Sequence, residues 1–453
     1  MHFVWHRSEL RTHDQPALAA AAAAGGPVLP LVIVDPVIFD RPTTTPRRQA
    51  WFLENVRALR EAYRRLGSDL IVREGVPHEV LGRLAREHRV TDAHYIRNHT
   101  PYAGERDEAA DRALREAGVE VHRHPGQYTH PPGEVLTGAG GRYSVFGPYA
   151  RNWLARPLPE LAPTPVGLPP VPGRIARGEI RRVESDVPLP PTGEAAALAR
   201  LEEFLRDGEA TYATARNFPA NRPSTSLLSM YFNLGVLGPR LAVRRAGDAK
   251  WRSELAWWDF NAEVLDRQPE GATLEYKESW RGFPWRHDDD ETRRWERGQT
   301  GYPMVDAGMR ELQATGFMHN RARLVTASFL TKHLLIDWRA GEAIFRGLLL
   351  CGDSAQNIGN WQWVAGSGYD ASPYFRVLNP VAQGEKFDPQ GEYVRRWVPE
   401  LAHLPGRAIH RPWKAPRPPA DYPPPMVALE VGRDRFLDTA RTFLKRGRAG
   451  RVD

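Results

Sequence analysis

The chain has 453 residues, a formal net charge of +7 and a single cysteine, Cys351. The length favours two or three domains, and one cysteine excludes an internal disulfide framework and a cysteine-rich metal site. No apolar run reaches the ~18 residues of a membrane span, and the alanine-rich stretch 17–24 lies too far in for a signal peptide. We therefore expect a cytoplasmic protein with no membrane partner, whose positive charge favours a polyanion.

Short apolar runs alternate with helical patterns over the first ~125 residues. The clearest helix is predicted over 51–66, where apolar residues recur every three or four positions. Strands that alternate with helices predict a doubly wound parallel sheet in an α/β domain. The strands are expected at 2–5, 28–34, 70–72, 93–96 and 119–121.

The predicted sheet has a candidate ligand edge where its strands end. The first strand leads into HRSELRTHDQPAL, which lacks the glycine fingerprint of a dinucleotide site, so a standard NAD pocket is disfavoured. Arg7, Asp35 and Asn98 follow strands and are candidate ligand residues. The simpler interpretation of each is a solvated loop residue.

The second half of the chain is predicted to be helical. Residues 157–191 contain ten prolines and predict an extended linker laid over the surface. We expect an α/β domain at 1–128, a linker at 129–193 and an all-α domain at 194–453. The predicted helices cover 195–205, 237–246, 251–265, 305–314, 321–336, 342–350 and 431–444.

Two segments of the helical part have side chains suited to binding. Residues 224–229, STSLLS, precede a helical pattern, so their hydroxyls either cap the helix or help it receive a phosphate. In 251–260, WRSELAWWDF, one helical face carries Glu254, Trp257 and Trp258. That face either contacts a nucleobase through its carboxylate and indoles or is a buried amphipathic face.

Two later segments add cations and aromatic rings. In 316–323, Arg321 and Arg323 could meet phosphates or a carboxylate, whereas the single His319 favours a structural role. No further group at metal-ligand spacing accompanies it, so no metal is expected. The stretch 350–376 holds Trp361 and Trp363 among Gly and Ser. It is either the wall of a pocket for a planar ligand or a loop that buries two tryptophans.

Ordered motifs along nearly the whole chain carry a family resemblance. The chain resembles the DNA photolyases of the cryptochrome/photolyase family, specifically the class I cyclobutane pyrimidine dimer enzymes. The resemblance implies an α/β antenna domain, a wrapping linker and a helical domain that binds FAD and lesion-containing DNA. It also implies light-driven repair, in which excited, fully reduced flavin lends an electron to a flipped-out dimer. The motifs are VWHRSELRTHD, TPRRQAWFLENVRALREAY, TSLLS, ELAWWDF, TGYPMVDAGMRELQATGFMHNRAR, WQW and SPYFRVLNPVAQGEKFDPQGEYVRRWVPEL.

The resemblance implies residues for each role. The FAD phosphates would be held by Tyr212, Thr225, Ser226, Leu227, Leu228 and Ser229. The flavin ring would be edged by Asn320, Arg323, Cys351, Gly352, Asp353 and Asn357, with Asn357 facing its N5 atom. Glu254 would hydrogen-bond the dimer while Trp257 and Trp363 pack on it, and DNA near the lesion would meet Arg216, Asn320, Arg321 and Arg376. The electron-transfer chain that re-reduces the flavin would be Trp361, Trp338 and Trp285.

Three positions depart from the family pattern. Leu227 and Trp258 stand where the family usually has Arg, and Cys351 stands where it usually has an Asp paired with the arginine at 323. Because an unpaired buried cation is costly, Arg323 is expected to find another acceptor, with flavin retention or redox tuning altered. In the antenna domain, Glu105 matches a pterin-contacting position but Gly104 replaces the neighbouring Asn. The antenna chromophore could be a folate, a deazaflavin or a second flavin, or be absent.

The resemblance leaves alternatives to dimer repair. A cryptochrome photoreceptor is the first, although the chain stops soon after its last predicted helix and lacks a long extension. A (6-4) photoproduct enzyme usually has paired histidines where this chain has His319 and Asn320. A degenerate relative that binds DNA and FAD with little repair is the third. The leading expectation is repair of cyclobutane pyrimidine dimers, and we expect the protein itself to be monomeric.

Overall fold

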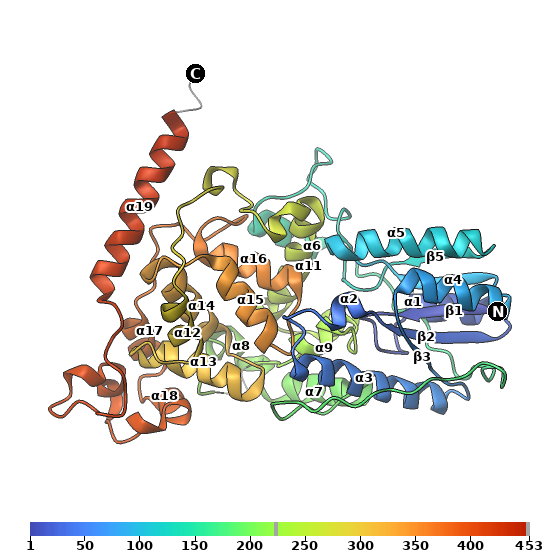
Figure 1. Ribbon diagram of the computed structural model, residues 1–453, viewed down its shortest axis with the longest axis horizontal. Coiled ribbons are helices and arrows are strands. Elements are labelled where there is room, and N and C mark those ends of the chain that lie inside the picture. The colour runs from blue at the N-terminus through green and yellow to red at the C-terminus, as the bar shows by residue number, and fades with distance from the viewer. Residues whose placement is uncertain (222–224, 450–453) are drawn as a thin grey trace. The chain divides into compact units, whose positions relative to one another are not determined.

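The structure is a computed structural model, and it describes residues 1–221 and 225–449 (Figure 1). By its internal contacts the chain divides into two compact units. Unit 1 comprises Met1–Ala210 and Ser226–Pro269, and unit 2 comprises Thr211–Thr225 and Glu270–Asp453. The expected division into domains at 128 and 193 remains a prediction.

All five predicted strands are present in unit 1 and form one parallel sheet in the order β3-β2-β1-β4-β5. Every residue of β2 is buried, which explains its unbroken apolar sequence VLPLVIV. The register places Trp5 opposite Leu31 and Val4 opposite His94. The strands are β1 (His2–His6), β2 (Val28–Val34), β3 (Ile71–Glu74), β4 (Asp92–Ile96) and β5 (Glu120–His124).

Five helices accompany the sheet, and each of them begins at a proline. Proline suits this position because its fixed φ is helical and its missing N–H would have no partner within the helix. The predicted helix 51–66 is the later part of one of them, α3. The helices are α1 (Pro16–Ala23), α2 (Pro36–Phe39), α3 (Pro46–Arg65), α4 (Pro77–His88) and α5 (Pro101–Glu116).

The two faces of the sheet differ in chemistry. One face packs against α4 and α5, where Phe3, Trp5 and Tyr95 join an apolar core with residues such as Leu84 and Leu114 (Figure 1). The opposite face carries more polar groups. On that face, the His6 Nε2 lies 2.6 Å from the Tyr63 hydroxyl of α3. Because side chains alternate along a strand, the histidines at even positions of β1, β4 and β5 share this second face.

The proline-rich segment 157–191 forms no helix or strand, and the structure describes all of it. It runs along the surface of unit 1, where Val72 N donates to Arg177 O over 2.7 Å and Leu168 N donates to Leu66 O over 2.7 Å. At Gly178, φ is +74° and an added Cβ would lie 2.1 Å from Val72 O. Only glycine allows so close an approach, and the segment is extended and attached as predicted.

Further helices complete unit 1 around the buried Asp259. Its carboxylate accepts hydrogen bonds from Thr129 N, His130 N and Trp153 Nε1 at 3.3, 2.9 and 2.8 Å. Burial raises the pKa of Asp259 to about 7, and these donors oppose the rise. Asp259 thereby ties α11 to the chain around α6. The helices are α6 (Phe146–Ala155), α7 (Glu194–Asp207), α9 (Ser229–Asn233), α10 (Pro239–Arg245) and α11 (Ala249–Arg267).

Unit 2 is helical, as predicted for this part of the chain. Its α13 starts beside a buried carboxylate, Asp306, which accepts hydrogen bonds from Thr300 N and the Tyr422 hydroxyl at 2.8 and 2.5 Å. Across the described residues, no helix is both long enough and apolar enough to cross a membrane. The helices are α8 (Tyr212–Ala215), α12 (Asp289–Glu296), α13 (Pro303–Thr315), α14 (Asn320–Ser328), α15 (Trp338–Leu348), α16 (Ser354–Ala365), α17 (Pro380–Phe387), α18 (Glu392–Trp397) and α19 (Leu429–Ala449).

The predicted helix 321–336 is wrong in its second half. The α-helix ends at Ser328, and Phe329–His333 form one wider π-helical turn. Leu335 then adopts a left-handed conformation with φ of +61°, which ends the helix. The apolar periodicity continues through this segment because all of it is buried, so the pattern could not reveal the break.

Candidate functional site

Asn357 lies near the start of α16 with its side chain fixed by Glu342. The α16 helix is capped by Asp353, whose Oδ1 accepts from Gln356 N over 2.9 Å. One turn into the helix, Asn357 Nδ2 donates to Glu342 O and Glu342 Oε1 at 2.9 and 2.8 Å. Both amide hydrogens are thus used, and Oδ1 is the atom left to accept a hydrogen bond from a ligand. Glu342 lies 15 positions away in the sequence, and no motif identified it.

His319 has the structural role favoured by the sequence. Its ring Nδ1 caps α14 by accepting a hydrogen bond from Arg321 N over 3.1 Å. Its backbone N–H donates to Glu311 Oε2, also over 3.1 Å. Burial lowers the pKa of His319 to about 3, with nearby arginines lowering it further. The imidazole is therefore neutral. The next residue, Asn320, is the first of α14 and is exposed, so its amide is accessible to a ligand.

Arg323 has found the alternative acceptor that the loss of the family aspartate required. Its Nε donates to Met318 O over 2.8 Å, and its Nη2 lies 3.7 Å from the Cys351 sulfur. Cys351 is buried, with 7% of its surface exposed. A backbone carbonyl and the Cys351 sulfur thus replace the expected carboxylate beside this guanidinium. Gly352 and Asp353 follow Cys351 and lead directly into α16.

Three predicted DNA-contacting arginines share one electrostatic environment in unit 2. Burial lowers the pKa of Arg321, and the positive charges of Arg216 and Arg376 lower it further. Arg321 Nη2 donates to Asn217 Oδ1 over 2.5 Å, and its guanidinium lies 4.1 Å from the centre of the Phe387 ring. Arg216 lies over the ring of Tyr212, 5.4 Å from its centre. Such a concentration of positive charge suits a phosphate backbone.

The segment that carries Arg376 is attached to the π-helical turn. Lys332 Nζ donates to Tyr374 O and Arg376 O at 3.2 and 3.0 Å. Leu378 N donates to Ser328 Oγ over 3.2 Å. The irregular end of α14 therefore positions Arg376. Sequence reasoning missed Lys332 because its role depends on backbone carbonyls more than forty residues away.

Two of the three predicted electron-transfer tryptophans meet at one carboxylate. The indole Nε1 atoms of Trp285 and Trp338 both lie 3.3 Å from Glu275 Oε1, to which they donate. Glu275 is 2% exposed, and its other oxygen lies 3.0 Å from Arg339 Nη2. The two indoles are therefore neighbours in the interior of unit 2. Glu275 itself was not anticipated from the sequence.

The third of these tryptophans, Trp361, packs on α15 just beyond Trp338. An added Cβ at Gly341 would lie 2.2 Å from Trp361 Cη2, so glycine is what allows the indole to reach the helix. The Trp361 ring centre lies 5.0 Å from that of Phe345. Trp361 is 2% exposed, whereas Trp363 is half-buried. Only the second indole of the WQW motif is thus partly accessible.

The predicted lesion-binding face of α11 belongs to unit 1. Glu254, Trp257 and Trp258 are half-buried, whereas Leu255 is buried, so this face is not ordinary core. Glu254 Oε1 pairs with Lys250 Nζ at 2.8 Å. Trp257 stacks on Phe146 with ring centres 3.7 Å apart and planes 14° apart. The flat Trp257 ring is thereby held at a fixed angle.

The predicted phosphate segment contains a left-handed turn before α9. Leu227 has φ of +55°, a conformation that costs a non-glycine residue about 1–2 kcal/mol and often marks a functional loop. Ser226 O accepts from Arg200 Nε over 2.9 Å, and α9 begins at Ser229, the last residue of the segment. Leu228 is fully buried, so only its backbone could meet a ligand. Ser224 lies outside the described residues, and Thr225 belongs to unit 2.

The candidate ligand residues at the sheet edge, Arg7, Asp35 and Asn98, are hydrogen-bonded to other protein groups, contrary to the simpler interpretation of solvated loop residues. Arg7 Nη1 donates to Asp107 over 2.5 Å, and the Tyr102 hydroxyl donates to Asp35 over 2.5 Å. Both pairs lie beyond the carboxyl ends of the strands and are at least partly buried. Asn98 Oδ1 accepts from Thr100 N over 3.1 Å. Sequence reasoning had no means of pairing these residues across the sheet edge.

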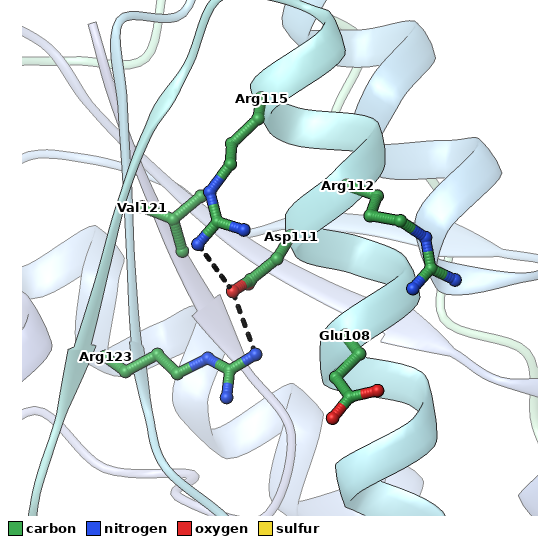
Figure 2. Close-up of a pocket in the computed structure, with 6 residues that line it drawn as sticks. All are labelled: Glu108, Asp111, Arg112, Arg115, Val121 and Arg123. Carbon is green, nitrogen blue, oxygen red and sulfur yellow. Dashed lines mark hydrogen bonds and ion pairs between the residues drawn. The ribbon is translucent and has the colours of Figure 1, made fainter.

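A separate charged pocket of about 470 Å³ lies between α5 and β5. Figure 2 shows Arg115 and Arg123 directed at Asp111, with distances of 3.2 and 2.8 Å. Arg112 and Glu108 lie apart from these three residues (Figure 2). The carboxylate partly neutralises the arginines, and the pocket contains none of the predicted site residues.

Comparison with known proteins gives consistent matches along the chain. Residues 2–169 match the family described as DNA photolyase, and residues 251–442 match the FAD binding domain of DNA photolyase. A deoxyribodipyrimidine photo-lyase of Thermus thermophilus is 45% identical over 98% of this chain and 99% of its own. A Synechocystis cryptochrome structure matches with a TM-score of 0.90 at 30% identity, over 97% of this chain and 99% of that one. A Sulfolobus tokodaii photolyase, solved with two FAD molecules, matches with a TM-score of 0.88 at 27% identity, over 98% and 100%.

Proposed function

The chain belongs to the DNA photolyase family, and from that premise we propose that it is a deoxyribodipyrimidine photo-lyase. It is a lyase that uses light to repair cyclobutane pyrimidine dimers in DNA, with FAD as its cofactor. The observation that carries the proposal is the 45% identity, over 98% of the chain, to a protein of that name. Within the family we assign it to the class I enzymes, on the ordered motifs of the sequence. The substrate requires a compartment that contains DNA, which agrees with the expected cytoplasmic location.

The side chains of Asn357 and Arg323 suit a flavin. Asn357 can only accept through Oδ1, because Glu342 takes both of its amide hydrogens. It therefore suits a ring N–H, which N5 of a reduced flavin has and N5 of an oxidised flavin lacks. Arg323 would bring a positive charge to an anionic reduced ring. The remaining FAD contacts are proposed for Tyr212, Thr225, Ser226, Leu227, Leu228, Ser229, Asn320, Cys351, Gly352 and Asp353.

When bound, FAD would supply the light-driven chemistry, in which one electron passes to the dimer and returns once the two bonds that join the pyrimidines have broken. The protein's task is to hold the lesion where this exchange can occur. Glu254 would accept a hydrogen bond from a pyrimidine N–H, exchanging its present partner Lys250, and Trp257 and Trp363 would pack on the bases. Arg216, Asn320, Arg321 and Arg376 would hold the surrounding DNA.

Three tryptophans are proposed to reload the flavin with electrons from outside. Trp285 and Trp338 share the Glu275 carboxylate, and Trp361 packs on the same helix as Trp338. An indole that loses an electron becomes a cation, and a neighbouring carboxylate stabilises it. Glu275 would therefore favour the passage of the hole from one indole to the next.

A second chromophore is proposed at the carboxyl edge of the sheet in unit 1. The structure from Sulfolobus tokodaii holds two FAD molecules and is described as implicating a novel light-harvesting cofactor. A flavin is the chromophore we favour, because Gly104 and the exposed Glu105 retain only part of the pterin motif. Arg7 and Asp35 lie at that edge, where doubly wound sheets bind ligands.

A flavin photoreceptor is the alternative, favoured by the TM-score of 0.90 with the Synechocystis cryptochrome. The two are separated by illuminating the reduced protein with oligonucleotides that hold one thymine cyclobutane dimer, one (6-4) photoproduct or no lesion. The proposal predicts light-dependent reversal of the cyclobutane dimer alone, and none in the dark. A protein that is reduced and loaded with FAD yet reverses no lesion is a photoreceptor or a degenerate relative.

A further inference from the structure

Four histidines and an aspartate gather on the helix-α1 face of the sheet, on the neighbouring strands β1, β4 and β5: His2, Asp92, His94, His122 and His124. The register places His2 opposite Asp92, and His94 opposite His122. His2 and Asp92 are 90 positions apart in the sequence, so no sequence spacing indicated the group. Asp92 belongs to two groups of residues that could each hold a metal ion. One group adds His2 and His94, and the other adds Glu120 and His122. In each set the atoms lie within 4.8 Å of one another.

We propose that His2, Asp92 and His94 form a binding site for one divalent transition-metal ion, with Zn²⁺ the best-fitting ion. Two imidazoles and one carboxylate are a common ligand set for zinc. Such an ion would tie the amino end of β1 to that of β4. The site is independent of the proposed repair function, and it departs from the expectation, drawn from sequence spacing, that the chain has no metal.

The hydrogen bonds of His2 leave a lone pair directed at a carboxylate. His2 Nε2 lies 2.8 Å from Gly25 O, and a carbonyl oxygen only accepts, so Nε2 carries the hydrogen. In the neutral ring Nδ1 is then an acceptor, yet it lies 3.2 Å from Asp92 Oδ2, which is also an acceptor. Two acceptors at this distance repel unless a cation lies between them. The cation is either a metal ion or a proton on His2.

His94 contributes a second buried nitrogen. The residue is 5% exposed, and its Nδ1 is engaged by His124 Nε2 at 3.1 Å. Its Nε2 is buried and has no hydrogen-bond partner among the described residues. A buried nitrogen without a partner is costly, and a metal ion would satisfy it. A proton on His2 would leave it unsatisfied, and this favours the metal.

Contacts outside the proposed ligand set hold Asp92 in place, and the ring orientations show which histidines can bind the ion. His122 Nε2 donates to Asp92 Oδ1 over 3.1 Å, which leaves Oδ2 for an ion, as in the carboxylate–histidine pairs of metal sites. The His2 and His94 rings are tilted by 56°, so their in-plane lone pairs can converge. His94 and His122 are stacked within 15° of parallel, so their lone pairs run side by side. His122 therefore supports the site rather than completing it.

The test is Zn²⁺ titration of FAD-loaded protein that has no histidine tag and has been stripped with a chelator. Calorimetry should give one Zn²⁺ per chain, and Zn²⁺ but not Mg²⁺ should raise the Tm. Asp92→Asn should weaken Zn²⁺ binding more than about 100-fold, the upper range for loss of a mere supporting group. This variant should still fold, because its amide can donate to His2 Nδ1. His94→Gln should act in the same direction.

Glu120→Gln is the matched control, because the Glu120 side chain is 75% exposed and lies 3.8 Å from His122. It should leave Zn²⁺ affinity unchanged, and FAD content should be equal in all variants. Absence of Zn²⁺ binding, or equal binding by wild type and Asp92→Asn, overturns the proposal and leaves a protonated His2 as the cation. Loss of binding in Glu120→Gln overturns it too, because the ion would then sit on Asp92, Glu120 and His122.

Discussion

Lys332 is a buried amine that gains or loses its charge near neutral pH. It is 1% exposed, and burial, with the nearby Arg376 cation adding to it, lowers the pKa of Lys332 from 10.5 to about 7. Between these values the unfolded chain holds a proton that the folded chain has lost. The free energy of unfolding should therefore rise with pH in this window, by up to about 1.4 kcal/mol per unit, and the slope should vanish below pH 7.

Lys332→Met should remove this contribution to the slope, which denaturant unfolding at a series of pH values would measure. Lys414→Met, at an exposed position, is the control and should keep the wild-type slope. Because Lys332 also holds the segment of Arg376, the first variant should bind DNA more weakly. A Lys332→Met protein with an undiminished pH slope would show that the amine is not the titrating group.

Cys351 removes a negative charge from the surroundings of the proposed flavin ring. Cys351→Asp would place a carboxylate beside Arg323, whose Nη2 is now 3.7 Å from the sulfur. Negative charge disfavours the electron-rich reduced flavin, so the reduction potential should fall by on the order of 30 mV, equivalent to ~1.4 kcal/mol for two electrons. Spectroelectrochemistry of the purified protein measures this, with Cys351→Ser as a neutral control. Unchanged FAD content and potential in Cys351→Asp would refute the idea that this departure tunes the flavin.

Single residues show where sequence reasoning stops. The need of Arg323 for a new acceptor could be predicted, because a missing carboxylate is visible in the sequence. Its actual acceptor, Met318 O, could not, because every residue has a carbonyl and only the fold decides which one is near. The same holds for Glu342 beside Asn357, a pair formed by two neighbouring helices.

Glu275 joins Trp338 of α15 to Trp285, which lies in the loop before α12. Trp338→Phe should slow photoreduction of oxidised FAD more than about tenfold, which corresponds to ~1.4 kcal/mol in the barrier. Repair by chemically reduced protein should be retained, because the tryptophans only reload the flavin. Glu275→Gln should slow photoreduction too, by withdrawing the charge that stabilises an indole cation.

The control for this prediction is Trp295→Phe. Trp295 is fully buried, and its ring centre lies 6.1 Å from that of Trp361, but it is outside the proposed chain. Transient absorption of the three variants would decide the matter. Equal photoreduction rates in Trp338→Phe and wild type would exclude Trp338 from the electron path.

Elements differed in how well the sequence predicted them. Strands β1 to β4 were found because buried parallel strands read as short apolar runs between helices. Strand β5 is half-buried or exposed, and its prediction came from Val119 and Val121 at its start. The helix over 321–336 was misjudged, because the π-helical turn at Phe329–His333 preserves the apolar pattern while changing the backbone. That turn is also what directs Lys332 toward the segment of Arg376. Here the departure from regular structure coincides with a proposed functional element.

The predicted site residues are divided between the two compact units. The face of α11 and the turn before α9 belong to unit 1, whereas Asn357, Arg323 and the arginine group belong to unit 2. The ordered motifs predicted both sets of residues, but they could not show which side chains the fold holds in place. The fixed Asn357 amide and the stacked Trp257 supply that information.

In the proposed reaction, light moves an electron to the lesion and back without net oxidation of the flavin. The most direct test follows thymine absorbance and flavin absorbance together, after a light flash on the reduced protein bound to a thymine dimer oligonucleotide. We expect thymine absorbance to return while the flavin remains fully reduced, and the dark control to stay unchanged. Oxidation of the flavin without return of thymine absorbance would contradict the proposed reaction.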